Sequence, residues 1–227
     1  MEKVVVSLGG SVLVPGEDDA RYLADLATLL RDVATQARLF AVTGGGRIAR
    51  YYIETGRLFG VPERALDEMG IEATRLNARL LGAALKGFAN REPARSYAEA
   101  ARLSKRHRVV LMGGTGPGHT TDRVSASLAR YVQAVRIVNA TSVDGVYSAD
   151  PKKDLRAKLL ERITFEELAR LAGDGHPAAG PSVVFDPVAA RVLVRDRIPL
   201  AVVHGRDLPA LRDAILGRAF RGTLVGD

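Results

Sequence analysis

Short runs of apolar residues, rich in valine and isoleucine, recur along this chain between segments with helical periodicity. Runs of this length and composition are typical of strands that are buried on both faces of a parallel sheet. Apolar residues at helical spacing follow in segments such as 19–36 and 121–133, and Asp186-Pro187 predicts a helix cap before a proline in the first turn. The alternation of strand and helix predicts an α/β fold with a parallel sheet covered on both faces. The strand-like runs are 4–8, 39–43, 108–112, 135–139 and 199–203.

The size and composition of the chain limit the fold and the chemistry. With 227 residues, 47% of them hydrophobic, the chain has enough material for one substantial domain or two small ones, and we expect a single compact unit. There is no apolar run long enough for a membrane span and no signal peptide before the first strand-like run, so we expect a cytoplasmic protein without a membrane partner. The absence of cysteine excludes disulfides, zinc–thiolate sites, iron–sulfur clusters and thiol nucleophiles.

The formal charge of +7 leaves three interpretations open. The 33 basic residues are interleaved with 26 acidic ones, and there is no basic tail or aromatic-rich basic segment. We therefore favour a solvated, arginine-rich surface over nucleic-acid binding, with attraction of small phosphorylated substrates as the third interpretation. No nucleic-acid partner is predicted.

Two segments differ from the strand and helix alternation. Residues 62–105 are mostly helical in pattern, and we expect them to lie against one edge of the sheet or to form a partner surface. Residues 173–182 read GDGHPAAGPS, which predicts a glycine and proline loop.

Glycine clusters follow three of the predicted strands. They are Gly9-Gly10-Ser11, Gly44-Gly45-Gly46 and Gly113-Gly114-Thr115-Gly116. In open α/β sheets, ligands bind beyond the carboxyl ends of the strands, and glycine lets the backbone approach an anion closely. Tight turns explain any one such cluster, but three in succession favour a single crevice for polyphosphate.

The stretch GGTGPGHT at 113–120 has the spacing of a P-loop, with His119 where the lysine belongs. A P-loop normally follows the first strand, whereas this stretch follows a later one. The Thr120 and Thr121 hydroxyls and an imidazole that gains a proton beside a phosphate dianion suit a monophosphate better than a magnesium-bound triphosphate.

A second motif is VDGVYSADPKKD at 143–154. Its Asp-Gly and Asp-Pro pairs are typical of turns, and an elaborate connection between a strand and a helix is one interpretation. The functional alternative is that Tyr147 offers its ring to a base, Asp150 accepts hydrogen bonds from the base or ribose, and Lys152 or Lys153 points at phosphate.

In chain order, these motifs resemble the archaeal-type uridylate kinases of the amino-acid kinase superfamily. The resemblance covers nearly the whole chain and rests on SLGGSVLVP, TGGGRIARYYIE, MGGTGPGHTTD, TSVDGVYSADPKKD and SVVFDPVAARVL. It implies a three-layer αβα sandwich with a mostly parallel central sheet. The expected organisation is a single domain at 1–227, with the N-terminal part on the UMP side and roughly 130–227 on the ATP side, assembled as a homo-hexamer (a trimer of dimers).

The resemblance also implies roles for individual residues. Lys153 is the leading candidate for stabilising the transferred phosphoryl group, and Lys152 is the alternate. Mg²⁺ would arrive with ATP and be held mainly by its phosphates, so no direct protein ligand is assigned. The positions that match the ATP side are Ser7, Leu8, Gly9, Gly10, Ser11, Gly46, Arg50, Thr141, Tyr147 and Asp150, and those that match the UMP side are Gly45, Asp67, Thr115, Gly116, Pro117, Gly118, His119, Thr120 and Thr121.

Three polar positions need separate comment. Many amino-acid kinases carry a lysine where this chain has Ser7, and the archaeal type tends to lack it. Asp144 is included among the candidate catalytic residues for orienting a lysine or a magnesium-bound water, although a turn carboxylate is the favoured interpretation. For Asp122 we expect either a helix cap or a residue that orders His119.

The activity implied is transfer of the ATP γ-phosphate to UMP, giving UDP and ADP for pyrimidine nucleotide biosynthesis. The alternatives are another kinase of the same fold, acting on acetylglutamate, carbamate or isopentenyl phosphate, and a non-catalytic relative that binds nucleotides or oxyanions.

Overall fold

The central sheet is mostly parallel and is formed in the order β3-β2-β1-β4-β6-β7-β5. The computed structural model describes residues 1–149, 154–172 and 185–227. Within these ranges every strand pair is parallel except β6 with β7, which is antiparallel. The strands are β1 (Lys3–Leu8), β2 (Arg38–Thr43), β3 (Val109–Met112), β4 (Arg136–Thr141), β5 (Arg162–Ile163), β6 (Leu200–His204) and β7 (Thr223–Val225).

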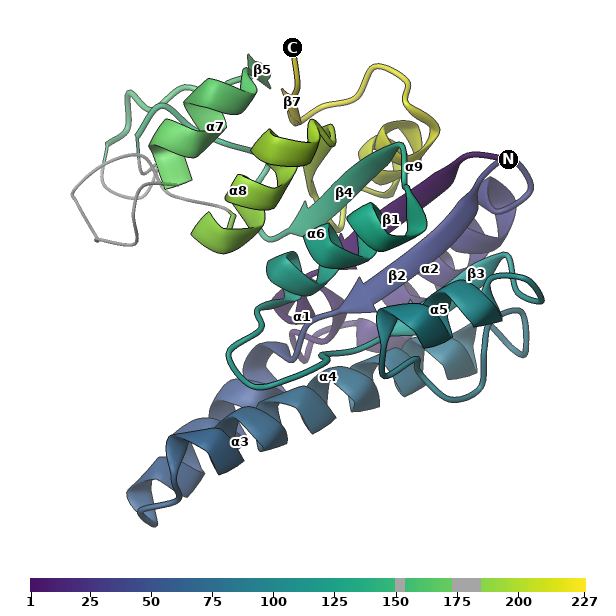
Figure 1. Cartoon of the computed structure of the whole chain (residues 1–227), viewed down its shortest axis with the longest axis vertical. Helices are drawn as coiled ribbons and strands as arrows, with labels where there is room; N and C mark the ends of the chain where they lie inside the picture. The colour runs from purple at the N-terminus through teal and green to yellow at the C-terminus, as the bar shows by residue number, and fades with distance from the viewer. Residues whose placement is uncertain (150–153, 173–184) are drawn as a thin grey trace.

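Helices cover both faces of this sheet, which makes the three-layer sandwich that was predicted (Figure 1). One core cluster joins the sheet to α1, α2, α4 and α9, and the other joins it to α5, α6, α7 and α8. The helices in the described residues are α1 (Gly10–Leu13), α2 (Asp19–Val33), α3 (Gly46–Leu58), α4 (Glu63–Ala84), α5 (Tyr97–Leu103), α6 (Thr121–Val132), α7 (Phe165–Ala172), α8 (Pro187–Asp196) and α9 (Leu208–Leu216).

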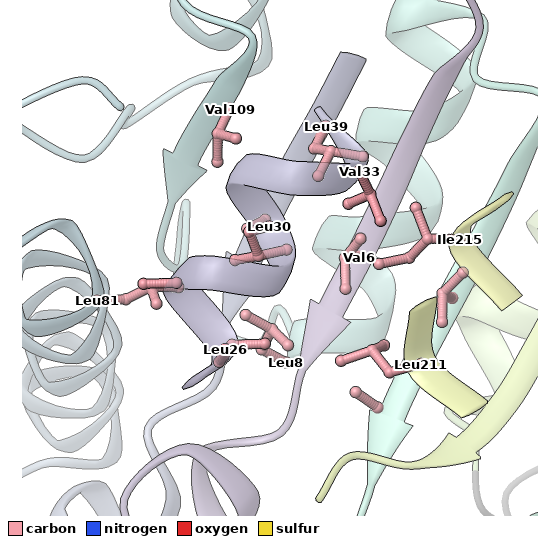
Figure 2. Packing of buried hydrophobic residues seen from close by; sticks show 14 of the residues in the cluster. Val6, Leu8, Leu26, Leu30, Val33, Leu39, Leu81, Val109, Leu211 and Ile215 are labelled. Atoms are coloured by element: carbon pink, nitrogen blue, oxygen red, sulfur yellow. The ribbon is translucent and has the colours of Figure 1, made fainter. Parts of the chain in front are cut away.

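The side chains of strand β1 contribute to the core clusters on both faces of the sheet. Val4 and Val6 belong to the cluster under α2 and α9, whereas Val5 belongs to the cluster on the opposite face. Successive side chains of a strand point to opposite faces, so a strand buried on both sides must be apolar throughout. Figure 2 shows Val6 and Leu8 packed with Leu30 and Val33 of α2, and with Ile215 of α9 on their other side.

The predicted strands are confirmed, with ends displaced by one or two residues. The predicted helix at 19–36 ends at Val33, and Asp186 caps α8 by accepting a hydrogen bond from the Ala189 amide at 2.9 Å. The short strands β5 and β7 were not predicted, because two or three residues carry too little pattern to be recognised. The loop predicted at 173–182 lies outside the described residues.

The mostly helical segment 62–105 contains α4 and α5. Helix α4 joins the core beside β2 and β3, and the 89–94 segment runs along the outer edge of β3 through isolated bridges at Ala89 and Ala94. Helices α3 and α4 form a hairpin that extends well beyond the sheet in Figure 1. None of the helices that the structure describes combines the length and the apolar character needed to cross a membrane.

Candidate active site

The glycine loops after β1 and β2 pack backbone against backbone. A Cβ on Gly10 would lie 2.2 Å from the Gly46 nitrogen and 2.6 Å from the Gly44 oxygen, and Gly46 itself has a φ of +60°. Neither position tolerates a side chain without a shift of backbone. Because β3, β2 and β1 are adjacent and parallel, their carboxyl ends bring all three glycine loops to one edge of the sheet, as predicted.

The end of β1 and the first loop contain half of the residues that were predicted to contact ATP, Ser7 to Ser11. The Gly9 amide donates to the Ala140 carbonyl at 3.0 Å, which fixes the loop to the end of β4. The Ser11 hydroxyl accepts from the Arg50 guanidinium at 3.3 Å, and Arg50 lies one turn into α3 from Gly46. The structure therefore brings Ser11, Gly46 and Arg50 together beside the loop.

A cavity of about 270 Å³ lies between α4, the 113–120 loop and the start of α6. Asp67 and residues 116–121 line it, which matches most of the residues predicted for the UMP side. Thr115 lines a different cavity, and Gly45 packs beside this one, against Ala49 and Gly70. The lining also includes residues that the sequence did not single out: Val42, Thr43, Ile53, Gly70, Ile71, Thr74 and Gly114.

The 113–120 loop is anchored to α4. The Asp67 carboxylate accepts from the Gly118 amide at 2.8 Å, and the Thr74 hydroxyl accepts from the Gly114 amide at 2.6 Å. Arg75 donates to the Gly114 carbonyl at 3.2 Å. These three contacts fix the loop at both of its ends and set the shape of the 270 Å³ cavity.

The end of the loop is suited to an anion. Thr120 caps α6 by accepting from the Arg123 amide at 3.1 Å, so the positive end of the helix dipole faces the cavity. His119 Nδ1 lies 3.0 Å from the Thr115 hydroxyl, and burial, then the charge of Arg123, lower the His119 pKa. Both effects favour the neutral imidazole, and a bound dianion would oppose them by favouring the protonated form.

Asp122 does not play either of the roles expected for it. Thr120 is the helix cap and Thr115 contacts His119, whereas the Asp122 carboxylate accepts from the Ser7 hydroxyl at 3.5 Å and from the Asp186 amide at 3.3 Å. Burial raises the Asp122 pKa to about 6, and the charge of Asp186 adds to this rise while the two hydrogen bonds oppose it.

The position of Asp122 makes it a functional candidate that sequence reasoning undervalued. It joins β1, α6 and α8 beside Ser7, the position at which the resemblance implies a lysine in many members of the superfamily. A buried carboxylate there favours a cation beside it. The clue in the sequence was the pair of aspartates in TTD and FDP, each at the start of a helix.

The residues predicted for the adenine side lie around the end of β4. The Thr141 carbonyl accepts from the Gly205 amide at 2.8 Å and Thr141 is in register with His204 of β6. Tyr147 forms an isolated bridge with Leu159. Asp150, Lys152 and Lys153 lie outside the described residues, so their roles stay predictions.

Asp144 lies in a turn that is held against the C-terminal strand. Its carboxylate pairs with Arg221 at 2.9 Å, and the Val146 amide donates to the Thr223 hydroxyl at 2.8 Å. These contacts favour the structural interpretation of Asp144, and its catalytic role stays a prediction.

The carboxylates of Asp122 and Asp186 lie near enough to influence each other, and Asp186 also caps α8. Hard carboxylate oxygens are the ligands Mg²⁺ prefers, usually one or two together with substrate phosphates. Among the described residues, no group of three or more histidine, aspartate or glutamate side chains is placed to hold a metal alone. The donor set therefore fits an ion that arrives with a nucleotide.

Comparison with known proteins identifies the family of the chain. The model of the amino acid kinase family matches residues 2–204. The chain is 44% identical over 227 residues to a uridylate kinase of Methanocorpusculum labreanum, and the match covers 100% of this chain and 97% of the relative. It is 43% identical over 223 residues to the uridylate kinase of Archaeoglobus fulgidus, and this match covers 98% of this chain and 99% of the relative.

Solved structures give the same result. The crystal structure of the Archaeoglobus fulgidus uridylate kinase has a TM-score of 0.89 at 41% identity, with 100% of both chains covered. The UMP kinase of Bacillus anthracis has a TM-score of 0.82 at 21% identity, covering 100% of this chain and 96% of the other, and shows the shared fold. The resemblance found in the sequence is confirmed, and the chain belongs to the amino acid kinase family.

Proposed function

We propose that this protein is a uridylate kinase, which transfers the γ-phosphate of ATP to UMP and releases UDP and ADP. The observation that carries the proposal is the 270 Å³ cavity formed by the 113–120 loop, which lies beside the packed glycine loops after β1 and β2. Full-length relatives at 43–44% identity bear the name of this activity. One domain would hold both nucleotides, with UMP on the N-terminal part and ATP on roughly 130–227.

UMP would place its phosphate at the start of α6. Residues 116–121 line the cavity there, and Asp67 shapes the loop from α4 by accepting from the Gly118 amide. A helix N-terminus and glycine-rich backbone together bind a phosphate dianion without a P-loop lysine. The P-loop spacing of GGTGPGHT would then be coincidental, since the loop serves the acceptor.

ATP would lie on the other side of the first glycine loop. Its phosphates would meet Gly9, Gly10 and Ser11, with Arg50 beside them, and its adenosine would lie near Thr141 and Tyr147. Gly10 packs against the 44–46 loop, and a Cβ on Gly44 would lie 3.2 Å from the Thr121 hydroxyl. The γ-phosphate at the first loop and the UMP phosphate at the start of α6 would therefore be neighbours.

The reaction needs positioning and positive charge rather than a base. The UMP phosphate is already ionised at neutral pH, and the loose transition state spreads charge over the equatorial oxygens of the transferred group. Lys153, or Lys152, would stabilise that charge. Mg²⁺ bound to ATP would neutralise the β- and γ-phosphates. Asp122, ionised when a cation is near, would hold that positive charge beside Ser7.

An acceptor panel tests the proposal. Purified protein is incubated with ATP and Mg²⁺ and with UMP, CMP, dUMP, AMP, carbamate, N-acetylglutamate or isopentenyl phosphate, and the phosphorylated products are identified. We expect UDP from UMP at a kcat/KM far above that of the other acceptors. Preferred turnover of another acceptor would replace the proposed substrate, and ATP binding without any turnover would favour a non-catalytic relative.

We also propose that the protein is a cytoplasmic homo-hexamer, a trimer of dimers, that serves pyrimidine nucleotide biosynthesis. The large exposed apolar side chains on α3 and α4 support self-association. The molar mass in solution, measured by light scattering on a sizing column, tests it: six chain masses are expected, and one chain mass at all concentrations would contradict it.

A further inference from the structure

Asn77 is a buried polar residue of α4 and is only 1% exposed. Its side-chain nitrogen donates to the Gly44 carbonyl at 2.7 Å and to the Gly45 carbonyl at 3.3 Å. Because both of these neighbours are acceptors, the side-chain atom that faces them must be the nitrogen of the amide rather than its oxygen. Asn77 therefore ties the buried face of α4 to the glycine loop that follows β2.

These two hydrogen bonds set the direction of two backbone amides. A trans peptide is planar, so its N–H points opposite to its own carbonyl. Holding the Gly44 and Gly45 carbonyls therefore turns the Gly45 and Gly46 amides away from Asn77. Among the described residues, neither amide has a hydrogen-bond acceptor, and the first turn of α3 has no side-chain cap. Both N–H groups are thus free to donate to a ligand.

The 44–46 loop lies where the two phosphates of the proposed reaction would meet. A Cβ on Gly44 would lie 2.7 Å from the Gly10 nitrogen and 3.2 Å from the Thr121 hydroxyl. The loop therefore lies between the first glycine loop, proposed for the ATP phosphates, and the start of α6, proposed for the UMP phosphate.

Helix α4 holds this loop and the acceptor loop with the same face. Thr74 precedes Asn77 by three residues, a spacing that places the two side chains on one face of the helix. The Thr74 hydroxyl accepts from the Gly114 amide at 2.6 Å, and the Thr74 carbonyl accepts from the Thr43 hydroxyl at 2.8 Å. The position of the 44–46 loop relative to the 113–120 loop is thus set by α4.

We propose that Asn77 is a positioning residue for phosphoryl transfer, which presents the Gly45 and Gly46 amides to the oxygens of the transferred group. The role rests on the function proposed above. In the transfer, the bond from the γ-phosphorus to the β–γ bridging oxygen breaks and leaves its electron pair on ADP, a bond to an oxygen of the UMP phosphate forms, and no proton moves. Amides of fixed direction stabilise the charge on the equatorial oxygens without having to reorganise.

The test compares two buried asparagines of the same chemistry. Asn77→Leu removes the donor, and Asn77→Asp keeps the shape but sets an oxygen against the two carbonyls. Asn90→Leu and Asn90→Asp are the matched controls, because Asn90 is 3% exposed and donates to the Glu92 and Leu111 carbonyls at the outer edge of β3. The measurements are Tm, kcat, the two KM values, and the Kd of a complex of ADP, aluminium fluoride and UMP, which imitates the transferred group.

We expect both Asn77 variants to lower kcat about a hundredfold, the size of effect that follows loss of an oxyanion donor, with each KM within about threefold of the wild type. The Kd of the aluminium fluoride complex should rise by a similar factor, because the amides act on the transition state. The Asn90 variants should lose Tm but keep kcat within about threefold. Losses of kcat no larger than those of the Asn90 variants would overturn the proposal and leave Asn77 a structural residue.

Hydrogen exchange of the wild type gives a test that does not depend on the folding of any variant. The Gly45 and Gly46 amides should exchange at least about tenfold more slowly in the aluminium fluoride complex than in the free protein, and unchanged exchange would overturn the proposal. Failure of the proposed function is distinct, since the wild type would then make no UDP. The variants would be compared with the acceptor that it does phosphorylate, and absence of any turnover would overturn both proposals.

Discussion

Replacing Asp122 with asparagine should stabilise the protein at neutral pH while impairing its activity. The Asp122 pKa rises from 3.8 to about 6 in the fold, chiefly through burial. The folded protein therefore binds the proton of the Asp122 carboxyl more tightly than the unfolded chain does. The stability that this protonated carboxyl contributes is fully present below pH 3.8 and is lost as the pH rises through 6. At 1.36 kcal/mol per unit, the charged form costs about 3 kcal/mol at pH 7.

The asparagine variant removes that charge with little change in shape. At pH 7, without nucleotide or magnesium, its free energy of unfolding should exceed that of the wild type by up to about 3 kcal/mol. For a chain of this size, this corresponds to roughly 6–12 °C in Tm. At pH 4 the wild-type carboxyl is mostly protonated, and the two proteins should differ little. The same variant should lose at least about tenfold in kcat, because a neutral amide cannot hold a cation beside Ser7.

Calorimetry or urea titration at pH 4, 5, 6 and 7 checks this prediction. The stability difference should grow between pH 4 and about pH 6 and level off by pH 7. Asp25→Asn, at an exposed carboxylate of α2, is the control and should show no such trend. An Asp122→Asn stability difference that is constant with pH, or a variant less stable than the wild type at pH 7, would refute the account of Asp122 as a buried, destabilised charge.

Three further substitutions test the site. Gly10→Ala should abolish activity and lower Tm by several degrees, because its Cβ would lie 2.2 Å from a backbone nitrogen of the neighbouring loop; activity and Tm like the wild type would contradict this contact. Thr74→Val leaves the Gly114 amide without its acceptor, which costs about 1–3 kcal/mol. KM for UMP should therefore rise about tenfold while KM for ATP stays unchanged, and equal changes in both KM values would point to general disorder. Lys153→Met should lower kcat at least about tenfold with little change in either KM. If only Lys152→Met does so, the role belongs to Lys152.

The sequence predicted the frame of the fold because its strands are buried on both faces. Such strands must be continuously apolar, so the run at 4–8 was recognisable without any tertiary information. The alternation with helices predicted a parallel sheet, and the glycine clusters after three strands predicted a shared crevice. The order of the strands, which places β3, β2 and β1 side by side, was not predicted. Strand β7 was missed because its three residues depend on pairing with β6 and β5 rather than on their own pattern.

The candidate site was predicted less completely, for reasons that are tertiary. Asp122 looked like a helix cap because local sequence cannot show that Thr120 already fills that role, or that Ser7 and Asp186 lie beside it. Thr74 is 40 residues from the Gly114 amide it binds, and no motif in the sequence around Thr74 indicated this contact. Contacts between distant segments decide which polar residue of a motif becomes functional.

The central claim is that the 113–120 loop and the start of α6 bind the phosphate of the acceptor. A crystal structure of the protein with UMP and a non-hydrolysable ATP analogue tests it most directly. We predict the UMP phosphate within hydrogen-bond distance of amides or hydroxyls at 116–121, and the ATP phosphates at Gly9–Ser11. A UMP phosphate bound at Gly9–Ser11, or outside the 270 Å³ cavity, would contradict the account.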